Sequence, residues 1–212
     1  MKNILIDLET LGRNSGCVIL SIGAVEFDLS TNKLEDLQSS EGFADISNII
    51  KDTFYSSIKV LPQLLEGAVI EKPTLDWWKS QSPEAKKVLS SGNSISIEEA
   101  LIKLKTFILK ECENVNDVVI WAQGTDFDIS MLRAAYTKYF GPDSIPWCHT
   151  NIRDSRTFIY TMNNIINPKN NDPYSIIPEF KSGIVHNAEF DAIRTAYNVV
   201  YINNSVKLFL NK

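Results

Sequence analysis

The hydrophobic and polar pattern at the start of the chain predicts strands. Residues 3–9 form a short run rich in Ile and Leu that ends in acids, which predicts a buried strand that delivers its last residues to an edge of a sheet. Residues 17–27 predict a second strand, and the Gly-containing turn between the two makes them an antiparallel pair. Residues 37–46 are a candidate for a third strand. We therefore expect a sheet that begins with antiparallel strands.

Helical signals dominate the rest of the chain. Three spaced prolines in residues 48–90 predict several short helices, because proline is favoured in the first turn of a helix. Residues 96–112 have apolar side chains at helical spacing, with Ser96 as the N-cap and Glu99 at the capping-box position. The same signals assign a buried strand at 117–122, helices at 126–140, 153–162 and 185–210, and an irregular loop at 168–178. This order of elements predicts a mixed α/β layered fold.

Length and composition indicate an ordinary globular protein. The 212 residues suffice for one hydrophobic core, and no repeat or composition break marks a linker, so we expect a single domain over residues 1–212. No stretch approaches the roughly 18 apolar residues that cross a bilayer. Asp7 and Glu9 interrupt the N-terminal apolar run too early for a signal peptide. We expect a cytoplasmic protein with no membrane role.

Cysteine usage and charge narrow the kinds of site. Cys17, Cys112 and Cys148 are odd in number and widely spaced, which indicates neither a disulfide framework nor a zinc site. The formal net charge is −5, from 21 basic and 26 acidic residues, which argues against a large basic surface for long nucleic acid. A nuclease remains possible, because an acidic cluster neutralised by divalent metal can receive phosphate.

Two acids alternate along the first predicted strand. Asp7 and Glu9 are separated by one residue, so both carboxylates project from the same face of the strand. Like charges held that close are costly unless a cation lies between them, and Mg²⁺ or Mn²⁺, which take oxygen ligands, meet that need. Taken alone, such a pair is more often a solvated strand end.

Two further groups of polar residues introduce helices. Asp126 and Asp128 follow the strand at 117–122 and a Gly turn; Asp126 suits a helix N-cap, whereas a capping role explains Asp128 less well. His186 and Asp191 begin the last predicted helix. Residues five apart are offset by about 140° on a helix, so these two can share a site only if His186 lies in the loop before it.

In this order along the chain, the three groups resemble the exonuclease motifs of the DEDDh, or DnaQ-like, 3′-to-5′ exonucleases, which have a ribonuclease-H-like fold. DLETLG followed by ILSIGAVEFD is similar to the first motif and second strand, GTDFDISML to the second motif, and HNAEFDA to the third. TLDWWKSQSPEA is similar to a segment of phage exonuclease A, exonuclease VIII-like and RNA-specific exonucleases. In the family the acid after Phe is catalytic, which favours Asp128; Asp126 stands where many members have a small or apolar residue.

The resemblance implies a five-stranded mixed sheet, its first three strands antiparallel, flanked by helices and holding two Mg²⁺ or Mn²⁺ ions. Asp7 would bridge both ions, and Glu9 and Asp191 would hold the ion that carries the attacking water. Asp128 would help to hold the ion on the leaving-group side. His186 would take the proton from the water, a role that suits histidine because an unperturbed imidazole titrates near neutral pH.

The same resemblance implies how the end of a substrate is held. Thr10 and Leu11 follow the first motif, where the backbone would meet the terminal sugar and an apolar side chain would wedge against the last base. Trp77 and Trp78 are adjacent and must point to different sides, so we expect one in the core and one near the groove. Our candidate for the stacking platform is Trp78.

The sequence therefore predicts a two-metal exonuclease that shortens single-stranded nucleic acid from its 3′ end, with DNA favoured and nucleoside 5′-monophosphates released. Three alternatives stay open: an exoribonuclease of the same fold, a catalytically silent nucleic-acid-binding module, and a metal-dependent hydrolase of small nucleotides. An intact set of five candidate residues argues against the silent module. The sequence does not determine the oligomeric state; a dimer is one option.

Overall fold

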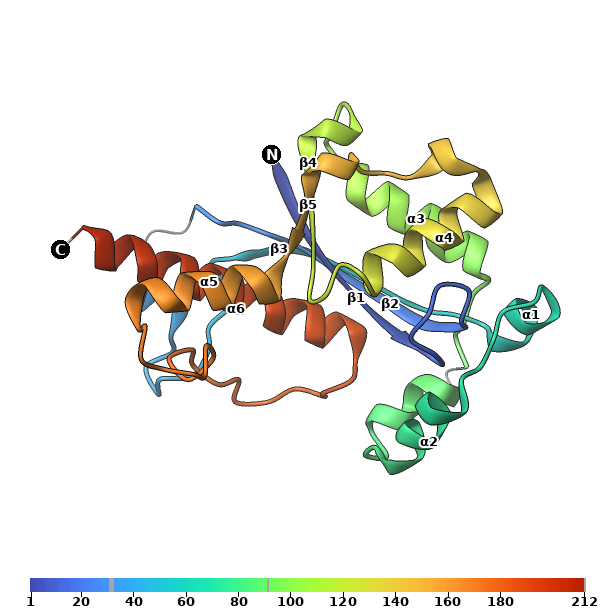
Figure 1. Cartoon of the computed structure of the whole chain (residues 1–212), viewed down its shortest axis with the longest axis horizontal. Coiled ribbons are helices and arrows are strands. Elements are labelled where there is room, and N and C mark those ends of the chain that lie inside the picture. The colour runs from blue at the N-terminus through green and yellow to red at the C-terminus, as the bar shows by residue number, and fades with distance from the viewer. Residues whose placement is uncertain (31–32, 91, 212) are drawn as a thin grey trace.

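One mixed sheet of five strands, in the order β3-β2-β1-β4-β5, organises the protein (Figure 1). The computed structural model describes residues 1–30, 33–90 and 92–211. The strands are β1 (Lys2–Thr10), β2 (Ile19–Phe27), β3 (Ile50–Ser57), β4 (Val118–Ala122) and β5 (Ile152–Asp154). Strands β1, β2 and β3 are antiparallel, whereas β4 and β5 run parallel to β1. This arrangement confirms the predicted mixed sheet with three antiparallel strands at its start.

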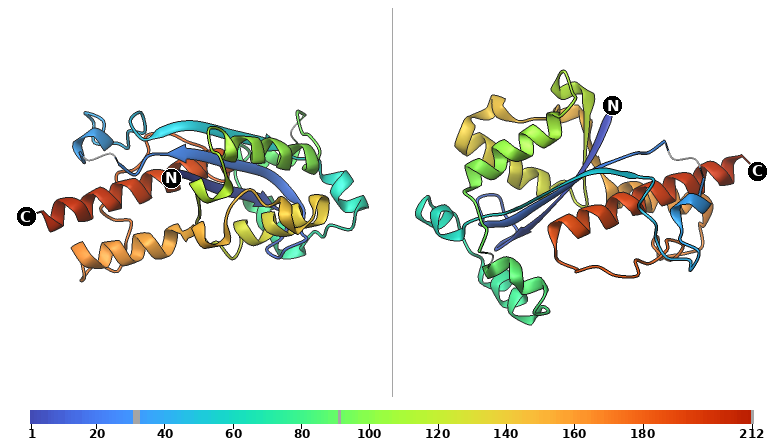
Figure 2. Two further views of the ribbon diagram at one scale, coloured as in Figure 1. Left: turned by 90° about the horizontal axis from the view of Figure 1, so that it is seen from above. Right: turned by 180° about the vertical axis from the view of Figure 1, so that it is seen from behind.

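Helices cover both faces of the sheet: α3 and α4 lie on one side, and α5 and α6 on the other (Figures 1 and 2). The helices are α1 (Val60–Leu65), α2 (Lys72–Ser80), α3 (Ile97–Leu109), α4 (Asp128–Phe140), α5 (Ser155–Ile166) and α6 (Ala188–Leu210). Short 3-10 turns are Glu35–Leu37, Ala85–Ser90, Val115–Asp117, Pro142–Ser144 and His149–Asn151. Within the described residues, none of the helices combines the length and apolar character needed to cross a membrane.

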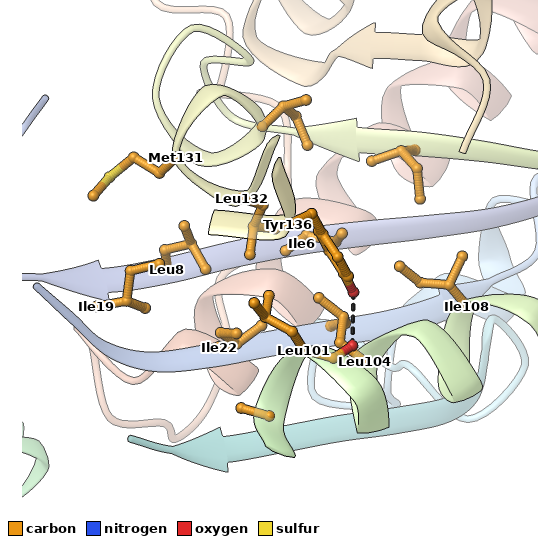
Figure 3. Close-up of a cluster of buried hydrophobic side chains, with 14 of the residues drawn as sticks. Ile6, Leu8, Ile19, Ile22, Leu101, Leu104, Ile108, Met131, Leu132 and Tyr136 are labelled. Carbon is orange, nitrogen blue, oxygen red and sulfur yellow. Dashed lines mark hydrogen bonds between the residues drawn. The ribbon is translucent and has the colours of Figure 1, made fainter. Parts of the chain in front are cut away.

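Strand β1 separates two hydrophobic cores, because its side chains alternate between the faces of the sheet. Ile6 and Leu8 pack in the core beneath α3 and α4, where the Tyr136 hydroxyl donates to the Leu101 carbonyl at 2.8 Å (Figure 3). Leu5 packs in the other core, beneath α5 and α6. Alternation continues past these residues, so the acids at the end of β1 face the α6 side.

The third strand is not where the sequence predicts it. Residues 37–46 contain the end of a 3-10 turn and a single bridge between Gln38 and Ala44. Strand β3 instead lies in the region assigned to short helices. It is an edge strand whose first six residues alternate between half-buried and exposed, so its sequence, IKDTFYSS, lacks the apolar content that marked β1 and β2.

The helices after residue 90 begin closer to their predicted positions than the elements before it. The Ser96 side chain accepts from the Glu99 amide at 3.2 Å, as expected for the cap of α3, and residues 168–178 contain neither helix nor strand. The predicted helix at 153–162 starts two residues late, because β5 takes residues up to Asp154, whose carboxylate caps α5. The assignment of Asp126 as a cap is wrong: α4 is preceded by Phe127 with no side-chain cap, and Asp126 is exposed.

The N-terminal turn of α6 lies directly on β2. Gly23 of β2 is paired with Asp7, and a Cβ atom on Gly23 would lie 2.1 Å from the carbonyl carbon of Ala188 and 2.3 Å from the amide of Glu189. Ala188 and Ala192 are fully buried against the sheet. The absence of a side chain at Gly23 therefore sets the distance between α6 and the acid-bearing end of β1.

We expect Gly23→Ala to lower the free energy of unfolding by about 1–3 kcal/mol, because the added methyl group must push the α6 backbone away. Urea denaturation measures the change. Gly92→Ala is the matched control, since a Cβ there meets nothing within 4 Å. Equal stability of the two variants would contradict the close approach of α6 to β2.

Candidate active site

The structure brings all five predicted site residues to one place at the carboxyl end of β1. Asp7 and Glu9 lie on β1, Asp128 is the first residue of α4, and Asp191 lies in the first turn of α6. His186 lies in the loop just before α6, as the sequence analysis required. One potential ligand atom each from Glu9, His186 and Asp191 lies within 4.8 Å of the others.

The carboxylates raise one another's pKa. Burial, followed by the charges of the three other acids, raises the pKa of Asp7 well above its ordinary value. Burial and the charges of Asp191 and Asp128 raise the pKa of Glu9 to about 8. Burial raises the pKa of Asp128 to about 7, against the opposing hydrogen bond from Leu8. Ionisation of Glu9 and Asp128 is therefore disfavoured near neutral pH unless another positive charge offsets it.

Backbone donors fix Asp128 within this cluster. Its Oδ1 accepts from the Leu8 amide at 3.0 Å, and the residue is only 2% exposed. Asp154 holds the preceding loop, because its Oδ2 accepts from the amides of Gly124 at 2.9 Å and Thr125 at 3.1 Å. Burial alone would raise the pKa of Asp154, but hydrogen bonds from Thr157, Thr125 and Gly124 lower it. The structure thus brings Asp128 to the other acids and leaves Asp126 at the surface.

Asp191 is held from both sides. Its Oδ2 accepts from the His186 amide at 2.8 Å, and its Oδ1 lies 2.9 Å from Nη2 of Arg194. Burial raises the pKa of Asp191, and Arg194 and the His186 amide oppose that rise. His186 has a left-handed backbone with φ of 64°, a conformation uncommon outside glycine, which turns the chain into α6.

The loop that bears His186 approaches α6 closely at a second point. Gly183 has a φ of 155°, and a Cβ there would lie 1.9 Å from the Phe190 ring. The Phe190 ring also packs edge-on against Phe180, with centroids 5.4 Å apart. The absence of a side chain at Gly183 therefore lets the loop pass close to the Phe180–Phe190 pair, three residues before His186.

A groove of about 440 Å³ opens beside the acids, and its lining corrects two substrate predictions. Thr10 lines the groove as expected, but Leu11 is buried in a small core with Trp78, so it cannot wedge against a base. Trp78 as a stacking platform is also wrong: it is 1% exposed, and its Nε1 donates to the Thr10 carbonyl at 2.8 Å. Trp77 lines the groove instead and is 41% exposed.

Two further lining residues were missed by the sequence analysis. Arg13 and Phe127 border the groove, one from the loop after β1 and the other next to Asp128. The available signal was their closeness in sequence to the predicted acids. The Glu71 carboxylate accepts from the Arg13 amide at 3.0 Å and from Nδ2 of Asn14, which ties this loop to the start of α2.

The donor set fits a hard divalent cation. Four carboxylates supply oxygen ligands, which Mg²⁺ and Mn²⁺ prefer. Arg194 is paired with Asp191, and Arg156 lowers the pKa of Asp128. Burial still outweighs Arg156 at Asp128, and burial together with the charges of the other acids raises the pKa of Asp7 and Glu9. A divalent ion at this position would replace the protons that the acids otherwise hold.

Comparison with known proteins identifies relatives along the whole chain. A family model described as the 3′-5′ exoribonuclease Rv2179c-like domain matches residues 2–203. An exodeoxyribonuclease of Enterobacteria phage T4 is 26% identical over 135 residues, which are 62% of this chain and 54% of the phage protein. The chain thus spans about half the length of that curated relative.

Solved structures show the same fold at low sequence identity. Escherichia coli exonuclease I in complex with single-stranded DNA aligns with a TM-score of 0.57 and 13% identity, covering 100% of this chain and 41% of that chain. Cell-death related nuclease 4 aligns with a TM-score of 0.58 and 10% identity, covering 96% of this chain and 64% of that chain. The nuclease domain of 3′hExo, a DEDDh family member bound to rAMP, aligns with a TM-score of 0.50 and 12% identity, covering 99% and 92%.

These likenesses confirm the expected ribonuclease-H-like fold and the resemblance to the DEDDh nucleases. The family match extends over every element that forms the candidate site, from β1 to the first turns of α6. The chain therefore belongs to the 3′-5′ exoribonuclease Rv2179c-like domain family.

Proposed function

We propose that this protein is a two-metal-ion exonuclease that removes nucleotides from the 3′ end of single-stranded nucleic acid and releases nucleoside 5′-monophosphates. The observation that carries this proposal is the cluster of four carboxylates with raised pKa beside a groove. Such a cluster has no structural use, because the acids destabilise one another unless cations accompany them. A phosphodiester substrate adds further negative charge, which the same cations would neutralise.

The relatives, rather than the acids, support a choice of substrate class. The family model that covers nearly the whole chain is described as an exoribonuclease, and the 3′hExo domain is described as bound to rAMP. The T4 relative is an exodeoxyribonuclease, but its match covers only 62% of the chain. We therefore place single-stranded RNA first and keep DNA, which the sequence analysis favoured, as the second candidate substrate.

Each acid has a role that its position supports. Asp7 has all three other acids as charged neighbours, so it would be shared by both cations; Glu9 and Asp191 would hold one cation, and Asp128 the other. When bound, the cations supply the charge that activates a water molecule and stabilises the leaving 3′-oxygen. His186, beside Glu9 and Asp191, takes the proton from that water.

The groove beside the acids would receive the terminal nucleotide. Its volume of about 440 Å³ lies in the range of small-ligand sites. Trp77 and Phe127 supply apolar faces for a base, Thr10 borders the acids, and Arg13 supplies a cation for a phosphate or sugar edge. Because the groove lies next to Glu9, a strand end seated there would place its last phosphodiester at the carboxylates.

We expect 5′-labelled single-stranded RNA, incubated with Mg²⁺ or Mn²⁺, to give a ladder that shortens from the 3′ end, with a weaker ladder on DNA of the same sequence. Gel electrophoresis shows the products. Asp128→Asn should remove the ladder, whereas Asp126→Asn, a change at an exposed acid nearby, should keep it. Cleavage of dinucleotides alone would support the small-nucleotide hydrolase, and binding without cleavage would support the silent module.

We expect His186→Ala to keep metal binding but to lose about 10²- to 10⁴-fold in rate, because the variant lacks the group that takes the proton. Calorimetric titration with Mn²⁺ measures the binding, and the initial rate of ladder formation measures the activity. His149→Ala is the matched control, since His149 is exposed and lies outside the acid cluster. Full activity of His186→Ala would remove His186 from the mechanism.

The raised pKa values predict how pH acts on the metal-free protein. The pKa of Glu9 is 4.5 ordinarily and about 8 in the fold, so the folded protein binds more protons than the unfolded chain between these values. The free energy of unfolding should therefore fall as the pH rises from 5 to 8, by roughly 1–3 kcal/mol.

Asp7→Asn should make this loss smaller, because it removes one of the repelling charges, whereas Asp126→Asn should leave the loss unchanged. Urea denaturation at pH 5 and pH 8 in EDTA measures both variants. Addition of Mn²⁺ at pH 8 should stabilise the wild type more than Asp7→Asn. A wild-type stability that rises between pH 5 and 8 would contradict the repulsion among the acids.

A further inference from the structure

Trp77 contacts both the candidate general base and the groove. Its ring packs edge to face against the His186 imidazole, with centroids 4.8 Å apart and an interplanar angle of 81°. The same side chain lines the groove together with Glu9 and Thr10 and is 41% exposed. One indole thus lies between the site where a terminal base would sit and the residue that would take the proton.

Helix α2 holds Trp77 in this position. The adjacent Trp78 is buried, and its Nε1 donates to the Thr10 carbonyl at the end of β1. The rings of Trp77 and Trp78 pack edge to face with centroids 5.0 Å apart, and Trp78 lies 6.4 Å from the His186 ring. Trp78 therefore holds α2 against the acid-bearing strand β1. Its ring contact with Trp77 fixes the position of Trp77 beside the groove.

The His186 side chain needs such support. Its backbone has a φ of 64°, and a left-handed conformation at a residue other than glycine persists only where its surroundings hold it. The His186 amide is fixed by Asp191 at 2.8 Å, but this bond leaves the imidazole free to rotate about its side-chain torsions. The Trp77 ring supplies a contact that restricts the imidazole itself.

We propose that Trp77 is a positioning residue that orients the His186 imidazole and, through its groove-facing side, couples that orientation to a base seated in the groove. This inference rests on the proposed function, in which His186 is the general base. A stacked terminal base would fix the indole, and the fixed indole would fix the imidazole. Loss of the contact lowers the fraction of correctly oriented His186, so it acts on kcat rather than on KM alone.

The kinetic test combines enzyme variants with two substrates. RNA with an ordinary 3′-terminal nucleotide is compared with the same RNA ending in an abasic residue. The wild type should show a lower kcat on the abasic end. Trp77→Ala should lower kcat on the ordinary end by about 2- to 10-fold, the range expected for an edge-to-face pair, and should show little further loss on the abasic end.

Two further variants separate positioning from folding. Trp77→Phe keeps an aromatic edge and should recover most of kcat. Tyr160→Ala removes an aromatic side chain of α5 that is 52% exposed, and it should leave kcat unchanged. An increase in KM with unchanged kcat for Trp77→Ala would overturn the proposal, since it would show that Trp77 only binds the base.

A second readout does not depend on activity. The chain has two histidines, so their imidazole signals can be assigned in a heteronuclear NMR spectrum from one His149→Ala variant. Trp77→Ala should move the His186 signals, because the indole ring current is lost, and should leave those of His149 in place. Unmoved His186 signals would overturn the proposal, whereas the absence of a ladder with the wild type would instead overturn the proposed function.

Discussion

Four acids are held close together near the end of β1, and the surrounding structure must offset the cost of keeping them there. Burial raises the pKa of all four groups, and the charges of the other acids raise the pKa of Asp7 and Glu9 further, so ionisation of these groups is unfavourable. A hydrogen bond to a charged group contributes about 1.5–3 kcal/mol, and two of the four acids accept one from the backbone of another residue. The Leu8 amide holds Asp128 and the His186 amide holds Asp191, while Arg194 neutralises part of the charge of Asp191.

The two hydrophobic cores supply the rigidity that this arrangement requires. Leu5 and Leu8 belong to opposite cores, so β1 is clamped from both faces along the segment that bears Asp7. The close approach at Gly23 then brings α6 onto the sheet. Apolar packing away from the site thus offsets the cost of holding the acids close together. Natural folds retain unfavourable local arrangements at functional sites in this way.

Local geometry made the acids and the histidine candidates, and the resemblance to the DEDDh motifs selected them as a set. Alternation along a strand puts Asp7 and Glu9 on one face, and the position of His186 just before a helix follows from its spacing to Asp191. The contact that holds Asp128 among the other acids is a hydrogen bond from the Leu8 amide, which is 120 residues away in sequence. The resemblance favoured Asp128 before the fold was known, but the capping argument offered for Asp126 was wrong.

The substrate side of the site could not be predicted in the same way. The sequence does not show which of Trp77 and Trp78 is buried. In the fold, Trp78 packs in a small core and donates to the Thr10 carbonyl, so its indole is the one that turns inward. Leu11 follows the first motif, yet it completes the small core that anchors α2. Strand β3 was not predicted, because it lies at the edge of the sheet, where a strand can form with few apolar residues. In each case the deciding partner comes from a distant segment.

An acidic protein can act on nucleic acid if recognition is confined to a strand end. Much of the basic surface is already committed: Lys79 is paired with Asp76 at 2.7 Å, and Lys181 with Glu41 at 2.5 Å. Long duplexes or strands bound by counterion release would need a broad set of uncommitted cations, which the net charge of −5 does not favour. The groove offers instead apolar faces, one arginine and Glu9, which belongs to the acid cluster. Under the proposed function, these features favour recognition of the last nucleotide of a strand over recognition of its length.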